Sequence, residues 1–243
     1  MFGEARIVLS ISPVQPDTRD IVERLLRDAS AWLVNRGIDQ WKEYPGLRDC
    51  IEAAMRCGTC FLAFKGQTPV ATLQVDSFAD PDFWTAGDQP GVALYVHRMA
   101  VDRAAAGEGL GRVLMDWAAC RAAAFGKAWL RLDAQKDNLG LHQYYANLGF
   151  TRVRVVDLPH RVSGALFQRS TAKPCLGGVA GACPSHCALQ GPSADWSNDG
   201  APASSRGRTE AGLLPPLGHD EVHGPAGEAV TRASVPESGI RSG

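Results

Sequence analysis

The sequence predicts a mixed α/β domain over roughly its first 170 residues. Three observations support this fold class. Segments with an apolar period near two alternate with segments whose apolar period is near 3.6 residues, as expected for strands alternating with helices. Glycine and proline fall between these segments, where turns are expected. The pattern ends near residue 170, where the composition changes.

The first part of the chain predicts a strand, two helices and a strand pair. A strand is expected at 5–12, and Asp17 and Gly37 suit the two caps of the helix that follows. A second helix is expected over 47–57, and strands at 59–66 and 69–78 form a hairpin. The first helix keeps one apolar face, made by Ile21, Val22, Leu25, Leu26, Ala29, Trp32 and Leu33.

The second part predicts a helix between two strands and then a short helix before a final strand pair. Gly126 is placed to end the longer helix. The expected elements are a strand at 92–102, a helix at 110–125, a strand at 128–135, a helix at 141–149, and strands at 150–158 and 164–170.

Residues 171–243 differ from the rest of the chain. They contain 12 glycines and 8 prolines in 73 residues, and their few aliphatic residues show no lasting period. Such a segment buries too little apolar surface to offset its conformational entropy. We therefore expect a folded domain at 1–170 followed by a disordered Gly/Pro/Ser/Ala-rich tail at 171–243.

The charge pattern argues against nucleic acid or a membrane as the partner. The formal net charge is −1, with acidic and basic residues interspersed. The opening stretch has no basic region followed by an apolar run, and no later stretch is long enough to span a membrane. The sequence therefore predicts a cytoplasmic protein with a small-molecule partner, either a monomer or a homodimer.

A glycine-rich stretch, GEGLGRVLM at 107–115, joins a predicted strand to a predicted helix. Glycines at a helix N-terminus expose several unpaired N–H groups, which suits an anionic group such as phosphate. A Walker loop would need Lys and then Ser or Thr after its last glycine, but Arg112 and Val113 follow Gly111. A dinucleotide-binding loop would need its third glycine at 112.

This stretch resembles the acyl-CoA pyrophosphate loop of the GNAT superfamily of N-acyltransferases. The similar residues are MAVDRAAAGEGLGRVLM at 99–115, and a second similar block is NLGLHQYYANLGF at 138–150. The resemblance covers about residues 5–170. It implies a central mixed, mostly antiparallel sheet flanked by helices, with acetyl-CoA as co-substrate and no metal. The superfamily usually has Arg or Gln before the first glycine, whereas this chain has Ala106, so Arg103 or Arg112 is left to supply positive charge.

The resemblance also implies roles for individual residues. Met99 N–H is expected to polarise the thioester carbonyl, and Tyr145 is expected to protonate the departing thiolate. The residues expected to bind CoA are Met99 and Val101 at the pantetheine arm, Gly107, Gly109, Gly111 and Arg112 at the pyrophosphate through their N–H groups, and Asn138.

Direct attack by an amine needs a base, because alkyl amines are mostly protonated at neutral pH. His97 is the best candidate: it lies two residues before Met99, so in a regular strand both side chains share a face. Asp76 and Asp133 are alternatives, as is an ordered water relay. Tyr145 and His97 also have simpler interpretations, as a packed aromatic residue and as a strand histidine with a neighbouring partner.

Two further groups of residues have competing interpretations. Trp32, Trp41, Phe83 and Trp84 either line an acceptor pocket or pack in the core, and packing is the more common fate of such residues. CGTC at 57–60 and CPSHC at 183–187 have metal-site spacing, but one zinc site would require the tail to fold back onto the domain. We expect no metal.

The sequence therefore predicts an N-acetyltransferase that moves an acetyl group from acetyl-CoA to a primary amine by direct attack, with a small molecule as acceptor. A protein N-terminal or lysine acetyltransferase is the enzymatic alternative, because the fold does not choose the acceptor. A non-catalytic acyl-CoA-binding or regulatory domain is a second alternative, and a tail that folds on a protein partner is a third.

Overall fold

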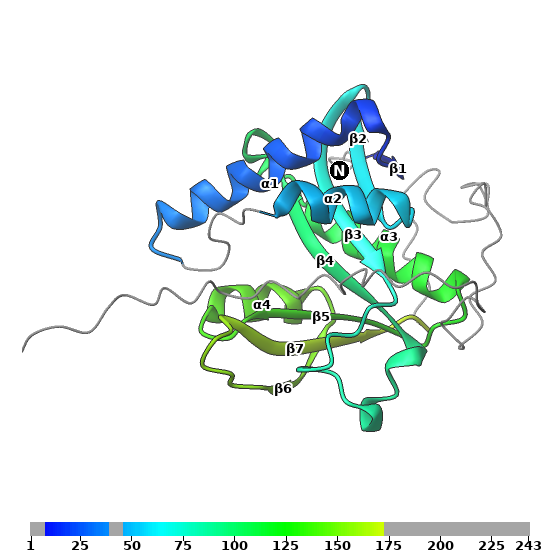
Figure 1. The fold of residues 1–243 in the computed structure, drawn as a ribbon, viewed down its shortest axis with the longest axis vertical. Helices are drawn as coiled ribbons and strands as arrows, with labels where there is room; N and C mark the ends of the chain where they lie inside the picture. Colours follow the sequence, from blue (N-terminus) through cyan, green and yellow to red (C-terminus); the bar gives the residue numbers. More distant parts are fainter. Residues whose placement is uncertain (1–7, 39–45, 173–243) are drawn as a thin grey trace, which may run out of the picture.

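A computed structural model describes residues 8–38 and 46–172, which form one seven-stranded sheet with helices on both faces (Figure 1). In chain order the helices and strands are β1 (Ser10–Pro13), α1 (Arg19–Val34), α2 (Leu47–Arg56), β2 (Cys60–Lys65), β3 (Thr68–Asp76), β4 (Ala93–Val101), α3 (Leu110–Ala124), β5 (Trp129–Gln135), α4 (Leu139–Asn147), β6 (Thr151–Val155) and β7 (Ser163–Ser170).

The sheet is mixed but mostly antiparallel, as predicted. Its strand order is β1-β2-β3-β4-β5-β7-β6, and only β4 and β5 pair in parallel. Parallel neighbours need a crossover connection, and α3 supplies it. The last hairpin folds back so that β7, and not β6, lies against β5.

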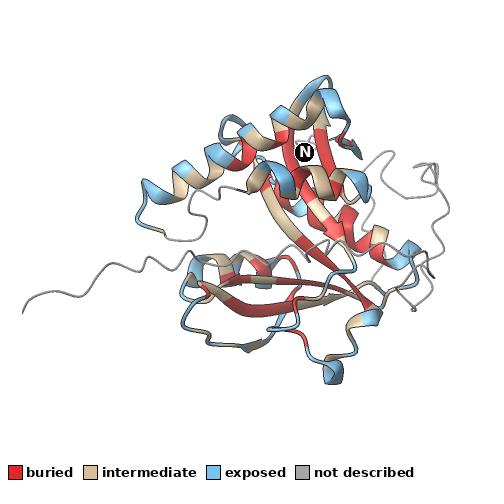
Figure 2. Cartoon of the chain, in the orientation of Figure 1, coloured by how far each residue is buried: buried red, intermediate tan, exposed pale blue. Residues whose placement is uncertain are grey.

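The strand period of two places apolar side chains on both faces of the sheet. On β2, Phe61 and Ala63 belong to the core cluster that α3 and α4 cover, while Cys60 and Leu62 belong to the cluster covered by α1 and α2. Figure 2 shows the buried residues concentrated along the middle of the sheet and on the inner faces of the helices. The sheet therefore has a helical layer on each side.

The segment before β4 is part of the core. Phe83 and Trp84 are buried and pack with Tyr95 of β4 and Leu166 of β7. Ion pairs hold this segment, including a buried one in which Arg161 Nη2 lies 2.6 Å from Asp80 Oδ2. The packing interpretation is therefore confirmed for these two aromatic residues.

The start of α1 differs from the prediction. Asp17 does not cap the helix; it lies within a short 3₁₀ turn at Pro16–Thr18. Thr18 Oγ1 donates to the Gln15 carbonyl and accepts from the Gln15 N–H, both at 3.0 Å. Proline at the start of the turn favours this tight entry, which the cap preference of aspartate alone does not reveal.

Some expectations fall outside the described residues. These are the start of the first strand at 5–7, Trp41, the CPSHC motif and the tail from 173 onward. Within 8–38 and 46–172, no helix is both long and apolar enough to cross a membrane.

Gly164→Ala is expected to destabilise the domain. A Cβ at Gly164 would lie 2.1 Å from the Val156 carbonyl oxygen, and the φ of +150° disfavours any side chain. Overpacking of this kind lowers the free energy of unfolding by about 1–3 kcal/mol, so the urea midpoint should fall. Gly91→Ala is the matched control, because its Cβ would meet nothing within 4 Å. Equal midpoints for the two variants would show that the backbone at Gly164 does not lie this close to the Val156 carbonyl.

Candidate active site

The two parallel strands at the centre of the sheet pair only at their beginnings. Ala93, Leu94 and Tyr95 of β4 lie opposite residues 129–131 of β5, and no pairing follows. Figure 1 shows the two strands diverging beyond this point. Over 96–101, the edge of β4 that faces β5 therefore has no strand partner among the described residues, and its backbone groups are available to an extended ligand.

A β-bulge changes the direction of β4 at Arg98. The register with β3 shifts between Thr72 and Gln74, and Arg98 has a φ of +46°, which is uncommon for a residue other than glycine. Met99 packs against the core cluster on the α3 side, whereas His97 contacts Asp76. The prediction that His97 and Met99 share a face was wrong, because the extra residue in the bulge interrupts the alternation.

Four polar side chains from β3 and β4 form a continuous array: Gln74, Asp76, His97 and Arg98. Arg98 Nη1 donates to Gln74 Oε1 at 2.6 Å, and Gln74 Nε2 donates to Asp76 Oδ2 at 2.6 Å. Asp76 Oδ1 accepts from the Phe78 N–H at 2.8 Å and lies 3.2 Å from His97 Nε2. The last contact has the distance of an ion pair but not the angle of a hydrogen bond.

The two titratable groups of this array stabilise each other's charged forms. Burial acts to lower the pKa of His97, but the adjacent Asp76 and the charge of Asp133 outweigh it and raise this pKa above 6.5. Burial acts to raise the pKa of Asp76, yet contacts with His97, Gln74 and the Phe78 N–H lower it overall. His97 is therefore a stronger base than an isolated histidine.

The glycine-rich loop exposes a row of free backbone donors where β4 leads into α3. Gly107 and Gly109 have φ values of +87° and +78°, and Gly109 caps the helix. Within the described residues, the N–H groups of 107–111 have no hydrogen-bond acceptor. With the positive end of the α3 dipole behind them, these groups fit a pyrophosphate.

The two arginines near the loop already have contacts. The Arg112 N–H donates to the Gly109 carbonyl at 3.0 Å, and its guanidinium donates to the Asn147 carbonyl at the end of α4. The Arg103 guanidinium lies over the Trp32 ring, 3.9 Å from its centroid. Arg103 and Arg112 are thus both engaged in contacts within the chain, and Lys65 Nζ donates to Glu108 of the loop at 2.7 Å.

Tyr145 lies in the core between α4 and the sheet. It packs against Phe150 and Phe167, and burial raises the pKa of its phenol well above 10, aided by the charge of Asp133. The phenol therefore carries its proton at neutral pH, and the raised pKa makes it a weaker acid than an exposed tyrosine. The charge of Asp133 on β5 raises the pKa of both His97 and Tyr145.

Tyr144 is a neighbour of the loop that the sequence analysis did not select. Its hydroxyl occupies the space beside Gly111 of α3, only 2.0 Å from where a Cβ would lie. A side chain at position 111 would therefore displace the Tyr144 hydroxyl. The repeated tyrosine in the second block was the available signal.

Asn138 is a helix cap. Its Oδ1 accepts from the Leu141 N–H at 3.0 Å and so begins α4. The amide nitrogen of its side chain is left free to donate to a cofactor.

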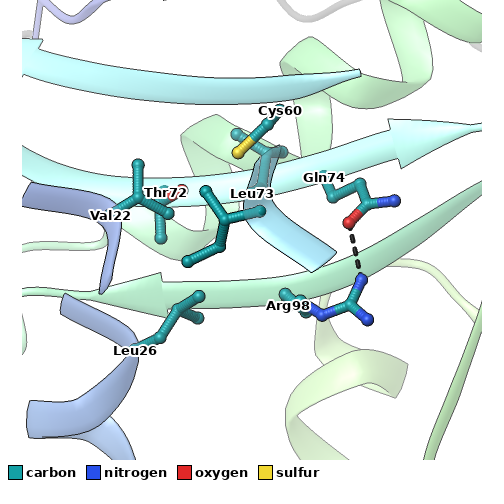
Figure 3. Close-up of a pocket in the computed structure, with 8 residues that line it drawn as sticks. Val22, Leu26, Cys60, Thr72, Leu73, Gln74 and Arg98 are labelled. Atoms are coloured by element: carbon teal, nitrogen blue, oxygen red, sulfur yellow. Dashed lines mark hydrogen bonds between the residues drawn. The ribbon is translucent and has the colours of Figure 1, made fainter. Parts of the chain in front are cut away.

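The two cysteines of CGTC form no metal site among the described residues. Cys57 and Cys60 are free thiols, and no cluster of three or more metal-binding side chains occurs in 8–38 or 46–172. Cys60 instead lines a small hollow under α1 and α2. Figure 3 shows this hollow, with Leu73 and Val22 on one side and the Arg98 guanidinium directed at Gln74 on the other.

Comparison with known protein families shows the family to which the chain belongs. The model described as the acetyltransferase (GNAT) family matches residues 21–150, more than half of the chain. The chain belongs to the GNAT acetyltransferase family. This GNAT chain is also 32% identical over 142 residues to the uncharacterized N-acetyltransferase YesJ of Bacillus subtilis strain 168, covering 56% of this chain and 78% of YesJ. These relationships support acyltransferase activity.

Solved structures of GNAT acetyltransferases share the fold. A GNAT acetyltransferase from Listeria monocytogenes superposes with a TM-score of 0.55 at 20% identity, over 67% of this chain and 94% of that one. The yncA protein of Salmonella typhimurium, a putative acetyltransferase solved with acetyl-CoA, superposes with a TM-score of 0.51 at 15% identity, over 68% and 95%. At these identities the likeness concerns the fold alone.

The contact between His97 and Asp76 is expected to make stability depend on pH. The raised pKa of His97 contributes stability that is complete below pH 6.5 and is lost as pH rises through the folded value. The lowered pKa of Asp76 contributes stability above pH 3.8 that is lost as pH falls. Asp76→Asn should therefore cost most between these values, about 2 kcal/mol.

Urea unfolding of wild type and Asp76→Asn from pH 4 to pH 9 measures this effect. The difference in unfolding free energy should shrink above the folded pKa of His97. A difference that stays constant over the whole range would show that the two side chains do not interact.

Proposed function

We propose that the protein transfers an acetyl group from acetyl-CoA to a primary amine by direct attack, with a small-molecule acceptor. The observation that carries the proposal is the row of free N–H groups at 107–111, placed where the unpaired edge of β4 ends. A pyrophosphate and an extended pantetheine arm need these two features side by side. Bound acetyl-CoA would supply a thioester carbonyl open to attack.

The chain's own residues divide into those that hold the cofactor and those that move protons. Gly107, Gly109 and Gly111 would donate N–H groups to the pyrophosphate, and Asn138 would contact the cofactor through its amide nitrogen. The backbone of Met99 and Val101 would pair with the pantetheine arm. The Arg112 N–H, already bonded to Gly109, would contribute through a shared hydrogen bond.

Three groups would act on the reacting atoms. The Met99 N–H would donate to the carbonyl oxygen as negative charge develops there. His97 would accept the proton that the amine nitrogen loses as it bonds to the carbonyl carbon. With Nε2 facing Asp76, Nδ1 is the nitrogen left for this proton. Tyr145 would donate a proton to the sulfur as the carbon–sulfur bond breaks.

A small-molecule acceptor is supported by the charge distribution. The chain's net charge of −1 provides no broad attractive surface for a strongly charged macromolecule. The candidate acceptor side of β4 carries one compact polar array, made by Gln74, Asp76, His97 and Arg98. Its size suits recognition of a few polar groups.

Gly109→Glu should abolish stabilisation by CoA compounds, because it places bulk and negative charge at the proposed pyrophosphate site. Wild type should gain thermal stability with acetyl-CoA or CoA and none with NADH. At a ligand concentration of about 100 Kd, the gain corresponds to about 2.7 kcal/mol.

Gly58→Glu is the matched control, since Gly58 has a φ of +63° with nothing near its Cβ position and lies in the α2–β2 turn. It should keep the full shift. Absence of any shift with CoA compounds in wild type would refute the proposed function. A shift without turnover of any amine would indicate a non-catalytic acyl-CoA-binding domain.

His97→Gln and Tyr145→Phe should reduce turnover without weakening CoA binding. Removing a general base or acid typically costs about 10²–10⁴ in rate, so kcat measured by thiol release should fall in this range. The thermal shift with CoA should match that of wild type. Unchanged kcat in His97→Gln over pH 6–9 would mean that a water relay or another group accepts the proton.

A further inference from the structure

The polar array of Gln74, Asp76, His97 and Arg98 contains a guanidinium without a carboxylate partner. Arg98 donates one hydrogen bond, to the neutral amide of Gln74, and its Nε is buried with no acceptor. Within 8–38 and 46–172, no Asp or Glu lies within ion-pairing distance of this side chain. A partly buried cation left in this state is costly, so an anionic partner from outside the chain would be stabilising.

The backbone holds Arg98 in this position at a cost. Its φ of +46° belongs to the left-handed region, and the bulge at 98 is what aims its guanidinium at Gln74. A strained residue with unused hydrogen-bonding capacity beside a catalytic base points to ligand binding. The ion pairs that link separate segments of the described residues, such as Arg154 with Asp88 and Arg161 with Asp80, do not include Arg98.

The surroundings favour a single negative charge. Arg98 is the only charged residue among those lining the hollow, and most of its neighbours there are apolar: Val22, Leu26, Ile51, Cys60 and Leu73. Figure 3 shows the guanidinium at the edge of this apolar hollow. An arginine fork pairs with a carboxylate through two parallel hydrogen bonds, and an apolar environment strengthens such a pair.

The array also offers a partner for each of two opposite charges on one ligand. Arg98 is linked through Gln74 to Asp76, which lies beside His97. Two hydrogen bonds, both made by Gln74, thus separate the Arg98 guanidinium from the Asp76 carboxylate, and His97 lies beside that carboxylate. A molecule that carries both a carboxylate and an amine presents the charges opposite to those of Arg98 and Asp76.

We propose that Arg98 binds the carboxylate of the acceptor, so that the substrates are free amino acids. The proposal rests on the proposed acetyl transfer and names the substrate class of that same site. It makes Arg98 a specificity-determining residue. The amine of the amino acid would then lie toward His97 and Asp76.

The test compares L-amino acids with their primary amides, which keep the amine and side chain but lack the negative charge. Leucine, methionine and serine, each paired with its amide, are assayed by thiol release with acetyl-CoA. Binding of the same compounds to the CoA-bound protein is measured by calorimetry. Wild type should favour each amino acid over its amide by at least about tenfold in kcat/KM and in Kd.

Arg98→Met should remove this preference. The loss should appear in KM for the amino acids, at least about tenfold, while kcat/KM for the amides stays within about twofold. The thermal shift with CoA should be unchanged. Arg152→Met, at an exposed position on β6, is the matched control and should retain the wild-type preference.

The outcomes separate the two proposals. Turnover of amides as fast as amino acids, or an equal loss for both in Arg98→Met, would overturn the carboxylate role and leave acetyl transfer intact. Carboxylate-dependent binding without any turnover would support Arg98 and overturn acetyl transfer. No binding of any amino acid would overturn the role of Arg98.

Discussion

The parting of β4 from β5 after three paired residues is the constraint on which the site depends. Two parallel strands at the centre of a sheet normally satisfy each other's backbone groups along their whole length. Here the pairing ends at Tyr95 and Arg131, yet the flanking pairs β3·β4 and β5·β7 continue. The sheet thus stays a single layer while exposing one internal strand edge.

The helices around this opening connect its two sides. The Arg112 guanidinium reaches from α3 to the carbonyl end of α4, and the Tyr144 hydroxyl lies against Gly111. The donor loop, the buried Tyr145 and the start of β5 therefore belong to one packed unit. On the opposite face, the array from Arg98 to His97 is bonded to β3 and does not depend on these contacts.

Most of the fold could be predicted because periodicity reports burial directly. The glycines from 107 to 111 could also be predicted, since a loop between a strand and a helix that needs free N–H groups tolerates few other residues. The face of His97 could not be predicted, because a bulge depends on register with β3 and leaves no mark in the letters around Arg98. The contacts of Arg112, Asn138 and Tyr144 could not be predicted either, because each depends on where α3 and α4 begin and end.

An unpaired strand edge on the outside of a protein invites aggregation, because it can recruit strands from other molecules. The open edge of β4 lies inside the sheet, with β3 on its other side and helices on both faces. A neighbouring polypeptide could not pair with it without separating packed layers. A single extended chain can therefore enter beside β4 where a strand of a second protein molecule cannot.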